Sequence, residues 1–145
     1  MTPVRVLFLC TGNSARSIIG QALLKAMGGD GFKAFSAGTA PKGINPLTVK
    51  ALLKVDIDIS GEHSKQVSEY EGQSFDYVIT VCDDAAEQCP VFPGDTARVH
   101  WSFPDPAAVE GRELQKLAAF QETVRGMRQR LSTFIDVAKG ASGSA

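Results

Sequence analysis

The sequence lacks any long apolar run and any excess of charge of one sign. No segment approaches the ~20 consecutive apolar residues that a membrane-spanning helix needs. Fifteen lysines and arginines oppose sixteen aspartates and glutamates, which gives a net charge of −1. This balance provides no basic footprint for nucleic acid or for an anionic membrane, so we expect neither as a partner. Any anionic ligand must then be bound by a local site.

Cysteine is also scarce, with only three residues among 145. A small, odd number of cysteines argues against a framework of structural disulfides and favours free thiols in a reducing compartment. The apolar run at residues 4–9 is too short for a secretory signal. We therefore expect a cytoplasmic protein whose thiols pair only transiently.

The composition that remains is that of an ordinary globular chain, with 43% hydrophobic and 21% charged residues. A chain of this length is near the commonest domain size and is long enough to bury a stable core without disulfides or bound metal ions. We expect one α/β domain over residues 1–139, followed by a flexible tail of small residues over 140–145.

Apolar runs of strand length alternate with segments of helical spacing. Strands are expected over residues 4–9, 32–38, 75–82 and 96–101. Helices are expected over 17–27, from Asn45-Pro46 to about 55, and over 112–139. The last helix carries an apolar stripe expected to be core: Leu114, Leu117, Val124, Met127, Leu131, Phe134 and Ala138. This alternation predicts a single doubly wound, four-stranded parallel sheet with helices on both faces.

Ligands of such sheets bind at the carboxyl ends of the strands. Cys10, Cys82 and the loop after Trp101 all follow expected strands. We therefore expect these three segments to converge on one site.

The segment CTGNSARS, residues 10–17, joins the first strand to the first helix. A tight loop at this place aims several backbone N–H groups at one point, and the helix N-terminus adds partial positive charge. Gly12 and Asn13 tolerate the positive φ angles that such a loop needs. Ser14 and Ser17 could cap the helix or donate to an anion. The segment is therefore typical of an oxyanion-binding loop.

Cys10 and Arg16 give this loop its chemistry. The same field favours the thiolate form of Cys10, which is the nucleophilic form. The planar guanidinium of Arg16 could bind two oxygens of a tetrahedral oxyanion. The alternative is that Cys10 is a small buried hydrophobe at the end of a strand. Arg-Ser at the strand-to-helix turn favours the nucleophile.

The octet Cys10-Thr11-Gly12-Asn13-Ser14-Ala15-Arg16-Ser17 resembles the signature loop of the low-molecular-weight protein tyrosine phosphatase superfamily, which includes the thiol-dependent arsenate reductases. The resemblance continues through Ser36-Ala37-Gly38 to Asp105-Pro106 and covers nearly the whole chain. It implies that residues 11–16 bind the substrate, that Ser17 stabilises the Cys10 thiolate and that Asp105 is the general acid.

Cys82 and Cys89 distinguish the two activities of this superfamily. A phosphatase needs one cysteine, an arginine and a general acid, and has no use for further thiols. The segment VCDDAAEQCP resembles the redox segment of arsenate reductases. Ala107 and Ala108 stand where phosphatases usually carry aromatic residues, which indicates a pocket for a small anion. We predict an arsenate reductase, with a low-molecular-weight protein tyrosine phosphatase as the alternative.

The resemblance implies a relay of thiols. Cys10 attacks arsenate, Cys82 attacks the Cys10 sulfur and releases arsenite, and Cys89 then takes over the disulfide. An external reductant, thioredoxin or glutathione with glutaredoxin, reopens it, and no bound cofactor is needed. An oxyanion sensor without turnover is a third possibility, but it has no use for Asp105 or for the two extra thiols.

Spacing adds two expectations. If residues 82–89 formed one continuous helix, its ends would lie ~10.5 Å apart, whereas a disulfide needs Cα atoms within about 7 Å. The segment should therefore unwind on oxidation. No pair of residues has the spacing of a structural zinc site, so we expect no metal. His63 and His100 are expected to be structural or surface residues, and Trp101 a packing residue.

Three residues depart from the reductase pattern. Ala15 stands where some of these enzymes carry another cysteine. Gln21 and Lys65 stand near the positions of acidic groups that hold a potassium ion in those same enzymes, the thioredoxin-linked arsenate reductases. We expect the Lys65 ammonium to take the place of this ion and to organise Asn13.

Overall fold

The computed structural model describes residues 2–87 and 89–143, apart from the side chains of residues 84, 86 and 140–143. Four strands form one parallel sheet in the order β2-β1-β3-β4: β1 (Val4–Cys10), β2 (Phe32–Gly38), β3 (Tyr77–Thr80) and β4 (Ala97–His100). The α-helices are α1 (Arg16–Gly28), α2 (Pro46–Leu53), α3 (Asp83–Glu87) and α4 (Glu113–Gly143). Short 3-10 turns cover Gly29–Gly31, Val67–Tyr70 and Pro106–Ala108. The expected parallel α/β fold is confirmed.

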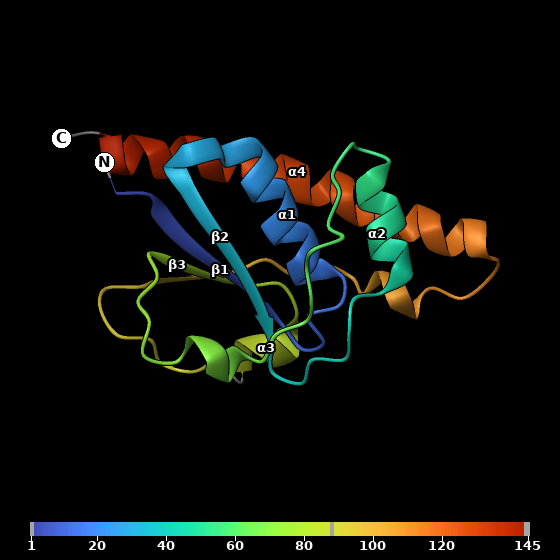
Figure 1. The fold of residues 1–145 in the computed structure, drawn as a ribbon, viewed down its shortest axis with the longest axis horizontal. Coiled ribbons are helices and arrows are strands. Elements are labelled where there is room, and N and C mark those ends of the chain that lie inside the picture. Colours follow the sequence, from blue (N-terminus) through green and yellow to red (C-terminus); the bar gives the residue numbers. More distant parts are fainter. Residues whose placement is uncertain (1, 88, 144–145) are drawn as a thin grey trace.

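One face of the sheet is covered by α1 and α4. A Cβ atom added to Gly20 of α1 would lie 2.6 Å from the Phe8 ring, so this helix packs directly on the central strand. Phe134 of α4 contacts the rings of Phe32 and Tyr77, with centroids 6.1 and 4.9 Å apart. Figure 1 shows α4 running along the length of the molecule, with α2 beside its first half. Apolar side chains of this face are therefore buried beneath the long helix.

The opposite face carries an aromatic cluster rather than a long helix. Phe35, next to β1 in the register, contacts both Tyr70 and Phe75 edge to face. Phe75 in turn contacts Phe92. The guanidinium of Arg5 lies 4.7 Å from the centroid of the Phe35 ring. The short helix α3 also contacts β1, so both faces of the sheet are covered.

The edges of several elements differ from expectation. The third strand is shorter than residues 75–82, because Phe75 turns into the aromatic cluster and Cys82 lies beyond the last ladder pair. Helix α4 continues to Gly143, beyond the end expected at residue 139, since no proline ends the helix there. Residues 144–145 of the expected tail lie outside the described residues.

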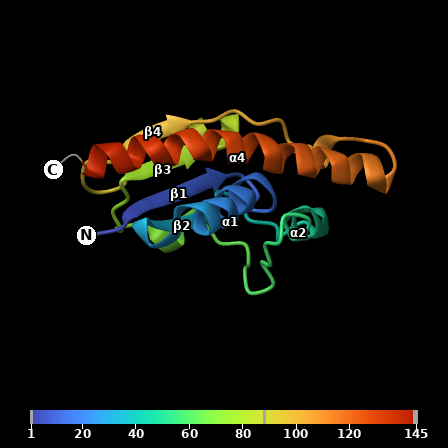
Figure 2. The same ribbon diagram turned by 90° about the horizontal axis from the view of Figure 1, so that it is seen from above.

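The apolar stripe of α4 packs as core over most of its length. Phe120, Val124, Met127 and Leu131 recur at helical spacing and are buried. Leu114 is the exception, with 80% of its surface exposed, because the first turns of α4 extend beyond the sheet. Figure 2 shows this overhang from above, with α2 on one side of it and the loop that leads into α4 on the other.

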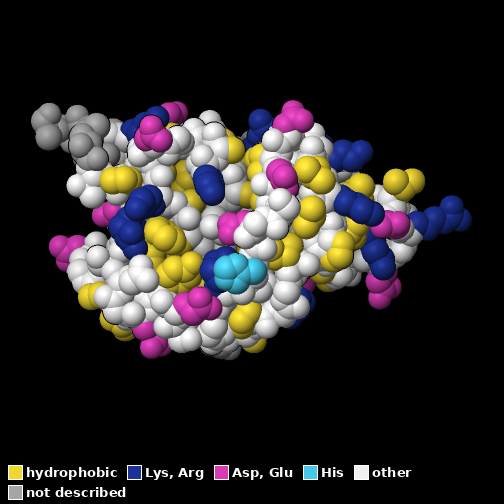
Figure 3. Space-filling view, in the orientation of Figure 1, with side chains coloured by type: hydrophobic (Ala, Val, Ile, Leu, Met, Phe, Trp, Pro, Cys, Tyr) yellow, Lys and Arg dark blue, Asp and Glu magenta, His cyan; other side chains and the backbone are white. Residues whose placement is uncertain are grey.

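Surface charge follows the near-neutral composition. On the face shown in Figure 3, acidic and basic side chains are interspersed. No helix in the described part of the chain is long and apolar enough to cross a bilayer.

Gly20→Val is expected to lower the free energy of unfolding by about 2 kcal/mol, because the new side chain must displace the Phe8 ring from a packed core. Gly61→Val is the matched control, since a Cβ there meets nothing within 4 Å. Its free energy of unfolding should change by less than about 0.5 kcal/mol. Urea unfolding of both variants under reducing conditions measures the difference. Equal effects would contradict the close packing of α1 on β1.

Candidate active site

The sulfur of Cys10 lies at the carboxyl end of β1, beneath the loop that leads to α1. Its Sγ lies 2.8 Å from Ser17 Oγ, and the Asn13 backbone N–H donates to it at 3.2 Å. Asn13 Nδ2 donates to the same Ser17 oxygen at 2.8 Å, which leaves the Ser17 hydroxyl proton free to donate to sulfur. Ser17 and the Asn13 N–H thus hold the buried sulfur in place at the base of the loop.

Asn13 is the internal support of the loop. It is completely buried and adopts a φ of 44°, as expected for this position. Its side-chain Oδ1 accepts from the Lys65 backbone N–H at 2.8 Å, and its carbonyl accepts from Ser64 Oγ. Asn13 therefore organises the loop from behind and does not line the cavity in front of Cys10.

The segment after β2 holds the loop from the other side. The N–H groups of Thr39, Ala40 and Lys42 donate to the carbonyls of Cys10, Thr11 and Gly12. A Cβ at Gly38 would lie 2.5 Å from the Thr11 carbonyl, so only glycine lets the two segments pass. The shape of the loop is thus fixed by backbone hydrogen bonds on this side and by the Asn13 side chain from behind.

The first turn of α1 has no side-chain cap. The N-cap residue is Ala15, and neither Ser14 nor Ser17 takes the capping role considered above, because Ser17 is bonded to Cys10. Uncapped N–H groups at a helix N-terminus are typical of a site that binds an anion.

A cavity of about 250 Å³ opens in front of the Cys10 sulfur. Its lining includes most of the residues expected to bind substrate: Thr11, Gly12, Ser14, Ala15 and Arg16. Ala40, Lys42, Asp105 and Ala107 complete the wall. The cavity thus brings the Cys10 thiol, two cations and a carboxyl group together.

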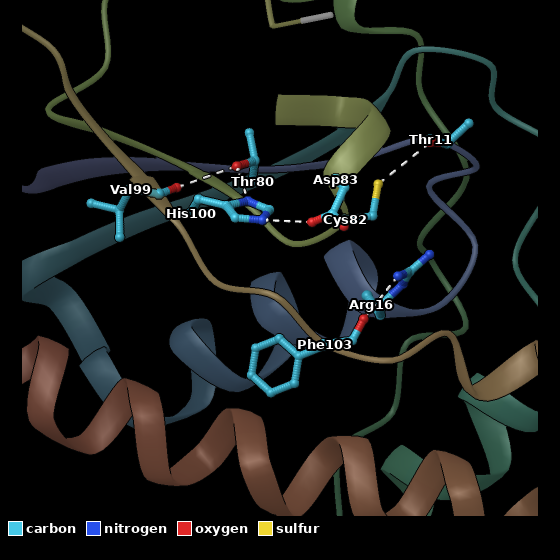
Figure 4. Close-up of polar contacts among 8 residues, drawn as sticks. All are labelled: Thr11, Arg16, Thr80, Cys82, Asp83, Val99, His100 and Phe103. Carbon is cyan, nitrogen blue, oxygen red and sulfur yellow. Dashed lines mark hydrogen bonds and ion pairs between the residues drawn. The ribbon is translucent and has the colours of Figure 1, made fainter. Parts of the chain in front are cut away.

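Arg16 and Asp105 are held by neighbouring contacts at this cavity. Arg16 Nη1 donates to the Phe103 carbonyl at 3.0 Å, which links α1 to the loop after β4 (Figure 4). Asp105 Oδ1 accepts from the Ala107 N–H at 3.0 Å and so caps the following 3-10 turn. The three segments expected to converge do converge.

Cys82 lies at the rim of the loop. It is buried, and its Sγ lies 3.4 Å from Thr11 Oγ1 (Figure 4). Helix α3 covers only Asp83–Glu87, so Cys82 precedes it and Cys89 follows it. The continuous helix considered for residues 82–89 is therefore not present, and both thiols are free.

Cys89 is partly buried, with its Sγ 3.5 Å from the Pro90 carbonyl. Burial raises the pKa of the Cys89 thiol above its ordinary value, and the nearby Arg98 charge opposes part of this rise. A thiol of this kind is mostly protonated at neutral pH and reacts slowly until it is deprotonated.

Lys65 differs from expectation in one contact. Its ammonium donates to the His63 carbonyl at 2.7 Å, whereas Asn13 is held by its backbone N–H. The ammonium therefore does not organise Asn13. Burial lowers the pKa of Lys65 below its ordinary value, while Glu62 and Glu69 oppose the shift.

Sequence reasoning missed two features. Lys42 reaches the cavity because its side chain packs over Gly12, where a Cβ would lie 2.9 Å from the Lys42 Cε. His100 bonds to both Thr80 and Asp83. The sequence signal for Lys42 was its position shortly after the second strand, at the carboxyl edge of the sheet where the cavity lies. Among the described residues, no group of three His, Cys, Asp or Glu side chains could hold a metal ion.

Comparison with known proteins gives one family. A model of the low molecular weight phosphotyrosine protein phosphatase family matches residues 5–139. The chain is 41% identical over 134 residues to an arsenate reductase from Bacillus subtilis, covering 92% of this chain and 96% of that relative.

Solved structures give the same fold. An arsenate reductase from Archaeoglobus fulgidus has a TM-score of 0.73 and 26% identity, covering 90% of this chain and 98% of that chain. A thioredoxin-dependent arsenate reductase from Corynebacterium glutamicum has a TM-score of 0.68 and 29% identity, covering 94% of this chain and 64% of that chain.

Proposed function

Because the chain belongs to the low molecular weight phosphotyrosine protein phosphatase family, we propose that its cavity reduces arsenate to arsenite through Cys10, Cys82 and Cys89. The observation that carries this proposal is the place of Cys82, whose sulfur lies within 3.4 Å of Thr11 in the Cys10 loop. Ester hydrolysis needs no second thiol there. The similarity to a Bacillus subtilis arsenate reductase supports the same substrate.

In the first step, the Cys10 thiolate attacks arsenic and forms a sulfur–arsenic bond. Asp105 gives a proton to the departing hydroxyl group of arsenate, which leaves as water. Arg16, Lys42 and the loop N–H groups stabilise the negative charge on the remaining oxygens.

In the second step, the Cys82 thiolate attacks the Cys10 sulfur and forms a disulfide. The sulfur–arsenic bond breaks with its electron pair on arsenic, so arsenic(V) becomes arsenic(III) and two thiols are oxidised. Cys89 then attacks Cys82, which frees Cys10 and leaves a disulfide between Cys82 and Cys89. An external dithiol reduces this bond, and similarity to the Corynebacterium glutamicum enzyme favours thioredoxin over glutathione with glutaredoxin.

Arsenite production by the purified protein tests the proposal. One arm supplies thioredoxin with its reductase, a second supplies glutathione with glutaredoxin, and a third measures p-nitrophenyl phosphate hydrolysis. Reduction in either redox arm supports the proposal and identifies the reductant. Robust ester hydrolysis without arsenite would favour the phosphatase alternative, which the family description supports. Oxyanion binding without either reaction would indicate a sensor.

Cys89 should become reactive only at alkaline pH. With Cys10 and Cys82 replaced by serine, its alkylation rate should rise about tenfold per pH unit until the raised pKa is passed. Arg98→Gln removes the charge that opposes this rise, so it should slow alkylation at pH 8. Arg128→Gln on α4 is the control and should leave the rate unchanged. Faster alkylation in Arg98→Gln would contradict the charge effect.

A further inference from the structure

A chain of side-chain contacts links the ends of β3 and β4 to the start of α3. Thr80 Oγ1 lies 2.7 Å from His100 Nδ1, and His100 Nε2 lies 2.9 Å from Asp83 Oδ1 (Figure 4). Thr80 is the last residue of β3, and His100 is the last residue of β4. Asp83 is the first residue of α3. The imidazole ring therefore bridges the sheet and the short helix through both of its nitrogens.

The sheet end of this chain is rigid. Thr80 is buried, and its carbonyl accepts from the Trp101 N–H at 2.8 Å. Thr80 also pairs with His100 in the β3–β4 ladder. The Asp83 end is exposed, with 81% of its side chain accessible. An exposed polar contact of this kind stabilises a fold by only ~0–1 kcal/mol. The His100–Asp83 contact therefore adds little to the free energy of unfolding. Its effect on the local backbone around α3 matters more.

That local effect falls on the turn that carries Cys82. Helix α3 has only five residues, and a helix of that length does not hold its own orientation in water. Thr80 and Asp83 flank the turn Val81-Cys82, and His100 contacts both of them. On the other side of the turn, the Cys82 sulfur lies beside Thr11 of the Cys10 loop.

We propose that His100 and Asp83 are positioning residues for Cys82, which fix the β3–α3 turn so that the Cys82 sulfur faces the Cys10 loop. The inference rests on the proposed function, because the attack of Cys82 on Cys10 is the step that this placement serves. Neither side chain touches the substrate cavity. Their loss should therefore slow disulfide formation without disturbing the chemistry of Cys10.

The first test measures the reactivity of Cys82 alone, in a protein with Cys10 and Cys89 replaced by serine. Cys82 is only 7% exposed, so its alkylation by iodoacetamide should be slow. Asp83→Ala and His100→Ala should each speed alkylation by about fivefold or more, because the freed turn exposes the thiol more often. The rate is read by mass spectrometry.

Two conservative variants separate position from charge. Asp83→Asn removes the same charge as Asp83→Ala but keeps an oxygen that accepts from His100. His100→Gln keeps a donor near the position of Nε2. Both should alkylate within about twofold of the parent rate. If Asp83→Asn speeds alkylation as much as Asp83→Ala, the effect is electrostatic and the positioning role is overturned.

The second test measures one turnover of arsenate in the wild-type background. Asp83→Ala and His100→Ala should slow arsenite release by about tenfold or more, since small displacements of a reacting group have large effects on rate. Hydrolysis of p-nitrophenyl phosphate should stay within about twofold. Glu113→Ala, which removes the remote exposed pair Lys50–Glu113 at 3.0 Å, is the control and should change neither reaction.

The outcomes of the two tests are separable. If the wild-type protein releases arsenite and both alanine variants release it equally fast, the positioning role is wrong while the proposed function stands. If the wild-type protein releases none, the proposed function fails, and the alkylation rates still decide whether His100 and Asp83 hold the Cys82 turn.

Discussion

Cys82→Ser is expected to reduce sustained arsenite production by about a thousandfold or more, while p-nitrophenyl phosphate hydrolysis stays within about twofold of wild type. A serine hydroxyl cannot form the disulfide that carries two electrons away from arsenic. The Cys10 sulfur should keep its contacts to Ser17 and to the Asn13 N–H, because Cys82 is hydrogen-bonded to the Thr11 hydroxyl and takes no part in those two contacts. Coupled reductase assays and a chromogenic ester assay on one protein preparation measure both activities.

The other two cysteines serve as controls for this result. Cys10→Ser should abolish both reactions, since it removes the nucleophile they share. Cys89→Ser should release about one arsenite per protein and then stall, with Cys10 and Cys82 joined as a disulfide. Wild-type arsenite turnover in Cys82→Ser would contradict the relay and would mean that the cavity reduces arsenate without a thiol at residue 82.

Local patterns in the sequence were sufficient to predict the fold. The run Val6–Leu9 is apolar on both faces, as a central parallel strand requires, and its side chains are fully buried. Asn45 and Pro46 predicted the start of α2, and Asn45 Oδ1 accepts from the Leu47 N–H at 2.9 Å. Each of these signals is contained within a few neighbouring residues.

The site was predictable where one segment builds it. The octet from Cys10 to Ser17 contains the thiol, the positive φ at Asn13 and the cation Arg16 within eight consecutive residues. Residues that enter from elsewhere gave no comparable signal. Lys42 reaches the cavity by packing over Gly12, which has no side chain in its way.

Contacts between distant segments were the least predictable. His100 is 17 residues from Asp83 and 20 from Thr80 in the chain, and only the β3–β4 register brings the three together. The same reason explains Lys65, whose backbone and not its charge holds Asn13. A backbone N–H can donate a hydrogen bond whatever the side chain is, so the residue type at position 65 could not predict this contact.

Arg16→Lys is expected to lower kcat/KM for arsenate and for p-nitrophenyl phosphate by about a hundredfold to a thousandfold. The guanidinium has enough donors to keep one bond to the Phe103 carbonyl and still present a planar pair to two oxygens of the anion. A lysine ammonium keeps the charge but loses this divided geometry. The loss should fall mainly on kcat, because the charge on the oxygens grows as the nucleophile attacks.

Lys42→Met is the matched control for Arg16→Lys, since it removes a cation from the same cavity wall. Lys42 is exposed, and its charge is screened by water, so its loss should raise KM by about tenfold or less and leave kcat nearly unchanged. A larger loss in Lys42→Met than in Arg16→Lys would mean that positive charge alone binds the anion. The contrast between the two variants thus separates orientation from attraction, because only Arg16 is tied to the loop that carries Asp105.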